Sequence, residues 1–165
     1  MKNSKSQRLT RASLSCAIYI ALSAIFAPIS FGPVQVRVSE ALTVLPLFFP
    51  ECSIGLTIGC VVSNFIFSTP LDAGIGGLAT LLSSLFTAIV GIKIRSNVKK
   101  IVLGELPVIL FNAFLVPFVF TAFSDGAVAY WYGFATVGLG ELVSVGVLGT
   151  VLYFAMKKIM KKSGE

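Results

Sequence analysis

The 165-residue sequence contains no histidine and few charged residues of either sign. Lysine and arginine number 13, and aspartate and glutamate number 7, so 12% of the residues are charged. Soluble domains carry roughly 25%. The lack of histidine argues against a zinc site, and the odd number of cysteines (Cys16, Cys52 and Cys60) argues against a disulfide framework. We therefore expect no metal site and assign the cysteines to packing.

The sequence also lacks the motifs that carry common enzyme chemistry. It has no GxxxxGK[ST] phosphate loop, which excludes that route to nucleotide hydrolysis. The sequence has no histidine, and it shows no nucleophile paired with a general base. We predict that the protein is not an enzyme, with no catalytic residues and no cofactor bound by this chain. No acidic series follows one segment, which argues against a proton relay.

Long apolar runs are what the sequence does contain, and 56% of its residues are hydrophobic. This composition predicts one all-α integral membrane domain over residues 1–165. The first run resembles a signal peptide but is longer than ~15 residues, so we interpret it as a retained span. The second is too short to cross a ~30 Å core as a straight helix, and Pro46 should kink it. The predicted spans are 10–29, 38–49, 52–67, 73–94, 101–123 and 128–156.

The basic residues predict how these spans are oriented. Six spans with a cytoplasmic N-terminus place 12 of the 13 basic residues on the inner side, as the positive-inside rule requires. Both termini are then cytoplasmic in a multi-pass protein. Only Arg37 falls outside. The other twelve form three clusters: Lys2, Lys5, Arg8 and Arg11; Lys93, Arg95, Lys99 and Lys100; and Lys157, Lys158, Lys161 and Lys162.

The outer stretch Phe31–Pro46, FGPVQVRVSEALTVLP, joins the first two spans. Val34, Val36 and Val38 alternate with polar residues, which predicts a partly extended first outer loop. Arg37 and Glu40 are expected to form a charge pair at the mouth of the helix bundle.

Polar side chains at membrane depth are costly in lipid, so they tend to face an interior cavity. Glu141 lies within span six directly after Gly138 and Gly140, which would leave room beside it, and Asn112 lies in the middle of span five. Glu105 is expected to form a surface salt bridge with the basic cluster beside it, and Glu51 to be solvated. The predicted ligand-binding residues are Glu141, Asn112, Asn64, Trp131, Asp72, Arg37 and Glu40.

Each candidate also has a structural interpretation. Trp131, Tyr130 and Tyr132 fit an interfacial aromatic belt, and Glu141 fits a structural pair with another span. Asn64 and Asp72 fit helix caps. Ser13, Ala17 and Ala21 recur every four residues and form a small face on the first span. Such a face suits either packing within the bundle or docking to a separate membrane subunit.

The segments FGPVQVRVSEALTVLP, GLTIGCVVSNF and LDAGIGGLATLL resemble the QueT family over about residues 8–158. This family comprises substrate-specific S-components of energy-coupling-factor (ECF) transporters, associated with uptake of queuosine precursors. The resemblance implies a bacterial cell-membrane protein of six helices that captures its ligand from outside and topples to deliver it inward. Its implied partners are a transmembrane coupling subunit, two ATPases that use the ATP, a small-molecule ligand and the lipid bilayer, with no nucleic acid.

The resemblance also assigns roles to residues. Ser13, Ala17 and Ala21 are similar to the Ala-xxx-Ala surface that contacts the coupling subunit, with serine at the first position. A 7-deazaguanine ligand presents N–H groups from which the Glu141 carboxylate would accept hydrogen bonds. Asn112 and Asn64 would serve its carbonyl and ring nitrogen, Trp131 or a tyrosine would stack on it, and Arg37 with Glu40 would form part of a lid. An S-component for another vitamin-like molecule and a self-sufficient small transporter or channel stay open as alternatives.

Overall fold

The structure is a computed structural model that describes residues 4–31, 35–122 and 126–162. Within these ranges all regular structure is helical and no strand occurs, which confirms the all-α prediction. The η1 segment is a 3₁₀-helix and η2 is a π-helix. In chain order the elements are α1 (Lys5–Ile25), α2 (Ala27–Ser30), η1 (Val38–Leu47), α3 (Cys52–Phe67), α4 (Pro70–Lys93), α5 (Asn97–Leu115), α6 (Pro117–Thr121), α7 (Gly126–Glu141), η2 (Leu142–Gly149) and α8 (Thr150–Lys162).

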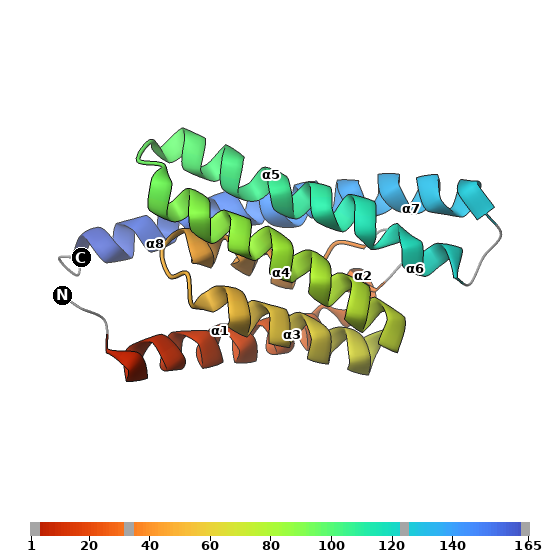
Figure 1. Ribbon diagram of the computed structural model, residues 1–165, viewed down its shortest axis with the longest axis horizontal. Coiled ribbons are helices and arrows are strands. Elements are labelled where there is room, and N and C mark those ends of the chain that lie inside the picture. Colours follow the sequence, from red (N-terminus) through yellow and green to blue (C-terminus); the bar gives the residue numbers. More distant parts are fainter. Residues whose placement is uncertain (1–3, 32–34, 123–125, 163–165) are drawn as a thin grey trace.

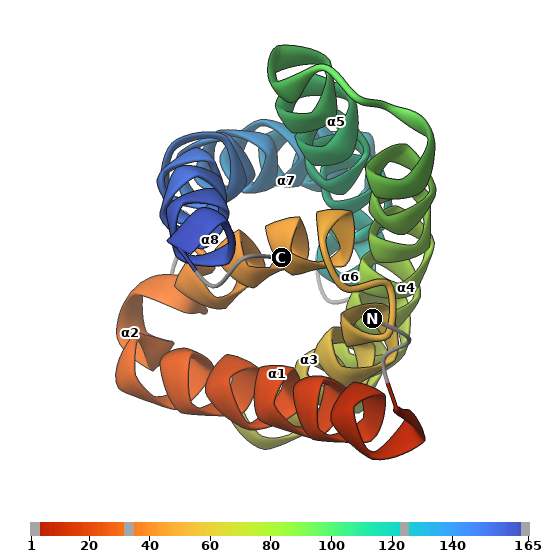
Figure 2. The same cartoon turned by 90° about the vertical axis from the view of Figure 1, so that its left-hand side faces the viewer.

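Successive long segments run in alternating directions along one axis (Figure 1). α1, α3 and α5 lead away from one end of the molecule, whereas η1, α4 and the continuous α7–η2–α8 helix return to it. The start of α1 and the end of α8 therefore lie at the same end (Figures 1 and 2).

Three helices in the described ranges are long and apolar enough to cross a membrane: Pro70–Lys93, Asn97–Thr121 and Val128–Lys162. η1 and α3 are apolar but shorter. The first part of α1 carries the basic residues Lys5, Arg8 and Arg11. Helices capable of crossing a membrane are thus confirmed, while the count of six spans and the orientation of the termini stay predictions.

The η1 helix is the centre of the bundle, with the long helices arranged around it (Figure 2). Nearly all of its side chains are buried, including Ser39, Glu40 and Pro46. A 3₁₀-helix rises about 2.0 Å per residue against 1.5 Å in an α-helix, so ten residues reach about 20 Å. This reach is still shorter than a ~30 Å hydrocarbon core. Because its side chains are buried, the short second span lies inside the protein, covered by the neighbouring helices. Val34 of the preceding alternation lies outside the described residues.

α1 packs closely on α3 through glycines. A Cβ at Gly55 would overlap the carbonyl oxygen of Ala12, and one at Gly59 would lie 2.9 Å from the Cβ of Tyr19. The inner face of α1 carries Ser15, Tyr19 and Ser23. Its outer face carries the small residues of the sequence pattern, which are all exposed, so the alternative that this face packs within the bundle is wrong. These residues are Ser13, Ala17 and Ala21.

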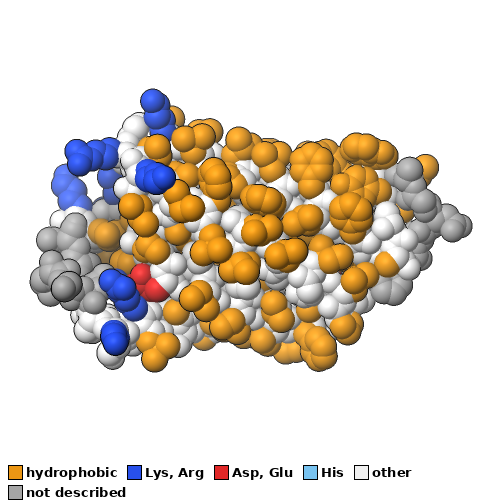
Figure 3. Space-filling model, in the orientation of Figure 1, with side chains coloured by type: hydrophobic (Ala, Val, Ile, Leu, Met, Phe, Trp, Pro, Cys, Tyr) orange, Lys and Arg blue, Asp and Glu red, His pale blue; other side chains and the backbone are white. Residues whose placement is uncertain are grey.

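The end of the molecule that holds the termini is rich in lysine and arginine, and apolar side chains are spread over much of the remaining visible surface (Figure 3). Glu51 is not simply solvated there: its carboxylate pairs with Arg11 at 3.3 Å.

The predicted surface salt bridge of Glu105 is wrong. Glu105 is buried and accepts a hydrogen bond from Thr150 at 3.1 Å. At about 100° per residue, it faces some 120–140° away from Lys99 and Lys100 on α5.

Candidate functional site

Polar and charged side chains meet in the interior, beside the start of η1. We call this group the central polar cluster. Its members come from four separate parts of the chain: the segment before η1, η1 itself, the α3–α4 corner and the end of α7. Each is at most 7% exposed, so the bundle withdraws them from both lipid and water. They are Gln35, Arg37, Glu40, Asn64, Asp72 and Glu141.

Arg37 joins the outer loop to α4. Its Nη2 lies 3.1 Å from Oδ2 of Asp72 and 3.2 Å from Oδ1, and both side chains are 2% exposed. The same nitrogen donates to Oε1 of Gln35 at 3.2 Å. The predicted charge pair of Arg37 with Glu40 is therefore wrong, and the α3–α4 corner supplies the partner. Asn64 braces this corner, because its Nδ2 donates to the carbonyl oxygen of Asp72 at 3.3 Å.

Asp72 reaches Arg37 because of how α4 begins. The N-cap of α4 is Thr69, whose Oγ1 accepts a hydrogen bond from the Asp72 amide at 3.1 Å. The Asp72 carboxylate is thus free to turn inward in the first turn, so the alternative that Asp72 caps the helix is wrong. Gly76, one turn later, lies against the pair: a Cβ there would be 3.4 Å from Nη1 of Arg37.

Glu40 occupies the first turn of η1 and is fully buried. Its Oε1 accepts hydrogen bonds from the hydroxyls of Tyr19 on α1 and Thr80 on α4. Arg37 and Glu40 are therefore interior groups rather than an exposed lid. Glu40 ties η1 to the helices on either side of it.

Glu141 ends α7, where the helix changes to the π-helical segment η2. It is fully buried and lies within electrostatic range of Glu40 and Arg37. The space beside Gly140 is filled, because a Cβ there would overlap the carbonyl oxygen of Gln35. Glycine at this position thus lets the loop backbone pass directly against α7. π-helical turns inside α-helices frequently mark functional sites.

Several buried polar atoms in this region have no hydrogen-bond partner among the residues the structure describes. Buried polar groups in native proteins are normally paired, and an unpaired carboxylate is especially costly. Both donors and acceptors are left over, as expected of a site that a polar ligand completes. The unpaired atoms are Nε and Nη1 of Arg37, Oε2 of Glu40, Oδ1 of Asn112, both carboxylate oxygens of Glu141, and the hydroxyls of Ser63 and Ser144.

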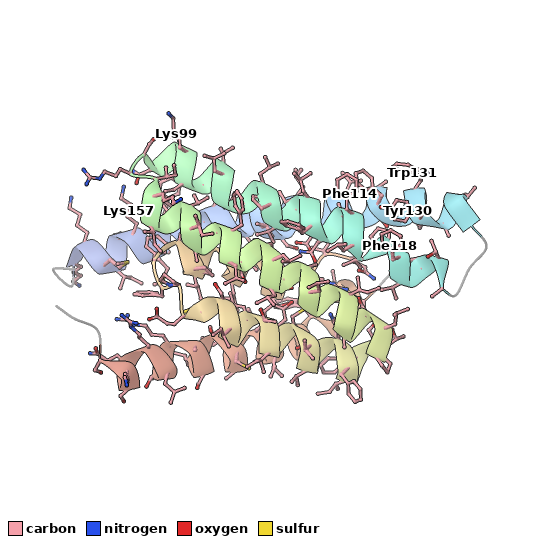
Figure 4. All side chains as sticks on the ribbon, viewed as in Figure 1. Lys99, Phe114, Phe118, Tyr130, Trp131 and Lys157 are labelled. Atoms are coloured by element: carbon pink, nitrogen blue, oxygen red, sulfur yellow. The ribbon has the colours of Figure 1, made fainter. Side chains whose placement is uncertain are left out.

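Asn112 and Trp131 differ in their relation to this cluster. Asn112 is fully buried on α5, and the next residue, Ala113, would be 3.6 Å from a Cβ at Gly138, one turn before Glu141. Trp131 is 61% exposed and stacks edge-on against Tyr130 and Phe134. It belongs to an aromatic group at the end opposite Lys99 and Lys157 (Figure 4). The structure thus gathers six of the seven predicted ligand residues in the interior and leaves Trp131 outside.

Other residues at the site were missing from the sequence prediction. Tyr19 and Thr80 hold Glu40, and Gln35 holds Arg37. The ring of Phe31 lies 5.7 Å from the Arg37 guanidinium carbon and offers an aromatic face there. A signal existed for two of these residues. Tyr19 lies in a polar stripe with Ser15 and Ser23 at four-residue spacing, and α4 carries a similar stripe of Thr80, Ser83, Ser84 and Thr87.

Comparison with known proteins gives two matches. Residues 9–158 match the family described as QueT transporter. Over 84 residues the chain is 39% identical to the queuosine precursor transporter QueT of Lactococcus lactis subsp. cremoris (strain MG1363), and this alignment covers 50% of each protein. No solved structure matches the chain. Because the family match extends over most of the sequence, the chain belongs to the QueT transporter family.

Proposed function

We propose that this protein is the substrate-binding S-component of an ECF-type importer for a queuosine precursor. The Lactococcus relative is named as a queuosine precursor transporter, which supports the choice of ligand. The ATPases would be separate subunits, since the sequence has no phosphate loop of its own. The observation that carries the proposal is the central polar cluster, in which buried donors and acceptors have no hydrogen-bond partner among the described residues.

We further propose six crossings with both termini in the cytoplasm of a bacterial cell. The alternating course of the helices supports this count (Figure 1). The basic side chains gather at one end, represented by Lys99 and Lys157, and the aromatic side chains of Phe118 and Tyr130 lie at the other (Figure 4). That distribution is the one expected for a cytoplasmic and an outer interface. The central polar cluster then lies on the route from outside.

The chemistry of the cluster suits a 7-deazaguanine base. One edge of that base carries neighbouring N–H donors, which match the two unpaired oxygens of Glu141. Its carbonyl oxygen matches the unpaired nitrogens of Arg37, which Asp72 and Gln35 leave free. Phe31, rather than Trp131, is the aromatic ring beside these groups.

The charges of the cluster distinguish among queuosine precursors. Three carboxyl groups (Asp72, Glu40 and Glu141) face one guanidinium, that of Arg37, which is committed to Asp72. A ligand with an ammonium group would offset the surplus. We therefore expect the aminomethyl base to bind at least about tenfold more tightly than the nitrile base, since a charge-assisted hydrogen bond is worth ~1.5–3 kcal/mol.

Calorimetric titration of the purified protein with both bases, queuine and guanine tests ligand class and charge together. Ligand-dependent stabilisation in thermal unfolding gives an independent reading. Binding of none of the three 7-deazaguanines, or of guanine alone, would contradict the proposed function. Equal affinity for the nitrile and aminomethyl bases would contradict only the charge argument.

The exposed small face of α1 is the proposed contact with the coupling subunit. Replacement of Ala17 by leucine is expected to reduce ATP-dependent uptake by at least tenfold in cells that co-express the coupling subunit and ATPases. Helices that meet through small residues approach closely, and an isobutyl group prevents this. Ligand affinity of the isolated protein should stay within about twofold, because Ala17 is exposed on the face of α1 opposite the buried Tyr19.

Ala135→Leu is the matched control, since Ala135 is an exposed alanine on α7. It should leave both uptake and binding unchanged. Uptake that persists without the ATPases would instead support a self-sufficient transporter and contradict the coupled mechanism.

A further inference from the structure

An apolar groove of about 660 Å³ runs along the outer surface between α4 and α5. It belongs to neither the central polar cluster nor the small face of α1. Its lining is entirely hydrophobic, and many of the side chains are 40–50% exposed, as with Leu78 and Phe86 on α4 and Leu106 and Phe114 on α5. In a membrane protein such a groove faces the hydrocarbon of the bilayer. Its lining residues are Leu78, Leu82, Phe86, Leu103, Leu106, Pro107, Leu110, Phe111, Phe114 and Leu115.

The length of the groove matches one leaflet. On α5 it extends from Leu103 to Leu115, and twelve residues of α-helix rise about 18 Å. Half of a ~30 Å hydrocarbon core is about 15 Å. A single acyl chain that enters from one side of the membrane would therefore follow the groove for most of its length.

Basic side chains stand at one end of this groove and in register with it. On α5, Lys99 lies one turn before Leu103 on the same face, and Leu106, Leu110 and Phe114 continue that stripe at spacings of three or four residues. On α4, Lys93 lies two turns beyond Phe86. Residues at these spacings share a helix face. The basic residues of the α4–α5 corner are Lys93, Arg95, Lys99 and Lys100.

No acidic side chain of these two helices opposes that charge. Glu105 points inward to Thr150, and Asp72 lies at the far end of α4 in its pair with Arg37. The corner therefore combines four cationic groups with the mouth of an apolar groove. A basic pocket between transmembrane helices on the inner side is the arrangement that binds anionic lipid head groups.

We propose that the α4–α5 groove and its basic corner form a binding site for one anionic phospholipid. An acyl chain occupies the groove, and the phosphate head group contacts Lys93, Arg95 and Lys99. An apolar partner helix would fill the groove but leave these charges unmatched, whereas a lipid with a net negative head group satisfies both features. This assignment rests on the proposed orientation, which places the α4–α5 corner at the inner leaflet.

The test compares phosphatidylglycerol with phosphatidylcholine on the purified full-length protein. Native mass spectrometry counts bound lipid, and thermal unfolding in detergent measures stabilisation by each added lipid. Phosphatidylglycerol is expected to bind more tightly, and K93Q/R95Q/K99Q should reduce its affinity by roughly tenfold or more. Leu110→Trp, which fills the groove at an exposed position, should reduce binding of the same lipid.

Two control variants isolate the site. K157Q/K158Q/K161Q removes three charges from α8 at the same end of the molecule, and Leu139→Trp adds a bulky side chain to an exposed position on α7. Both should retain the lipid. Equal losses in the two charge variants would mean general surface attraction and would overturn the proposal. So would equal binding of the two lipids, or unchanged binding in Leu110→Trp.

Discussion

Replacement of Glu141 by glutamine is expected to weaken binding of the aminomethyl 7-deazaguanine base by about 100-fold or more. Both carboxylate oxygens are fully buried and have no partner in the described part of the chain, so a ligand would be their first hydrogen-bonding partner. Hydrogen bonds to a charged group contribute about 1.5–3 kcal/mol each, and the amide retains only one acceptor. Loss of one such bond, together with loss of the charge on the other acceptor, accounts for the expected change, which calorimetric titration measures directly.

The same substitution should leave the ligand-free protein at least as stable as the wild type. An unpaired buried carboxylate is costly, and a neutral amide of the same shape removes that cost. Loss of affinity with unchanged or raised thermal stability would thus separate ligand recognition from a structural role. Glu105→Gln is the matched control, since Glu105 is buried but satisfied by Thr150. Glu141→Gln with affinity within threefold of the wild type would contradict the assigned role.

Much of the candidate site was predictable because charged residues are rare in this sequence. A carboxylate or amide within an apolar span has few places to go other than the interior, and composition alone directs attention to Glu141, Asn112, Asn64 and Asp72. All four are buried in the structure. The alternation of apolar runs and turns likewise predicted the order of the helices.

The partners of these residues were not predictable from local spacing. Arg37 and Glu40 are three residues apart, which suggested a pair. Arg37, however, is the N-cap of η1 with φ −84° and ψ 88°, so its side chain leaves the helix direction that Glu40 follows. The actual partner, Asp72, is 35 residues away, and only the packing of α4 against η1 brings the two together.

Trp131 and the glycines of α7 show the same limit. An aromatic residue near a span end fits a ligand site and an interfacial belt equally well by sequence. Its 61% exposure places it on the outer surface. Gly140 was interpreted as room for a ligand, but the Gln35 backbone occupies that space. A missing side chain in sequence does not say which neighbour fills the gap.

Asp72→Asn is expected to destabilise the protein by about 3–5 kcal/mol. The carboxylate is the only ionic partner of Arg37 in the described ranges, and both side chains are 2% exposed. Removal of one member of a buried ion pair leaves the other charge uncompensated in a medium that solvates it poorly. A denaturant titration of the detergent-solubilised protein measures the change in unfolding free energy.

The double variant R37Q/D72N should recover part of this loss, because it removes both charges and leaves two neutral groups that can hydrogen-bond. Glu51→Gln provides the comparison at a solvent-accessible ion pair, where side-chain exposures of 23% for Arg11 and 18% for Glu51 limit the expected cost to about 1 kcal/mol or less. If Asp72→Asn cost no more than Glu51→Gln, the Arg37 pair would have to be accessible to water. Recovery in the double variant would instead assign the loss to an unpaired guanidinium, the same group whose free nitrogens are proposed to receive the ligand.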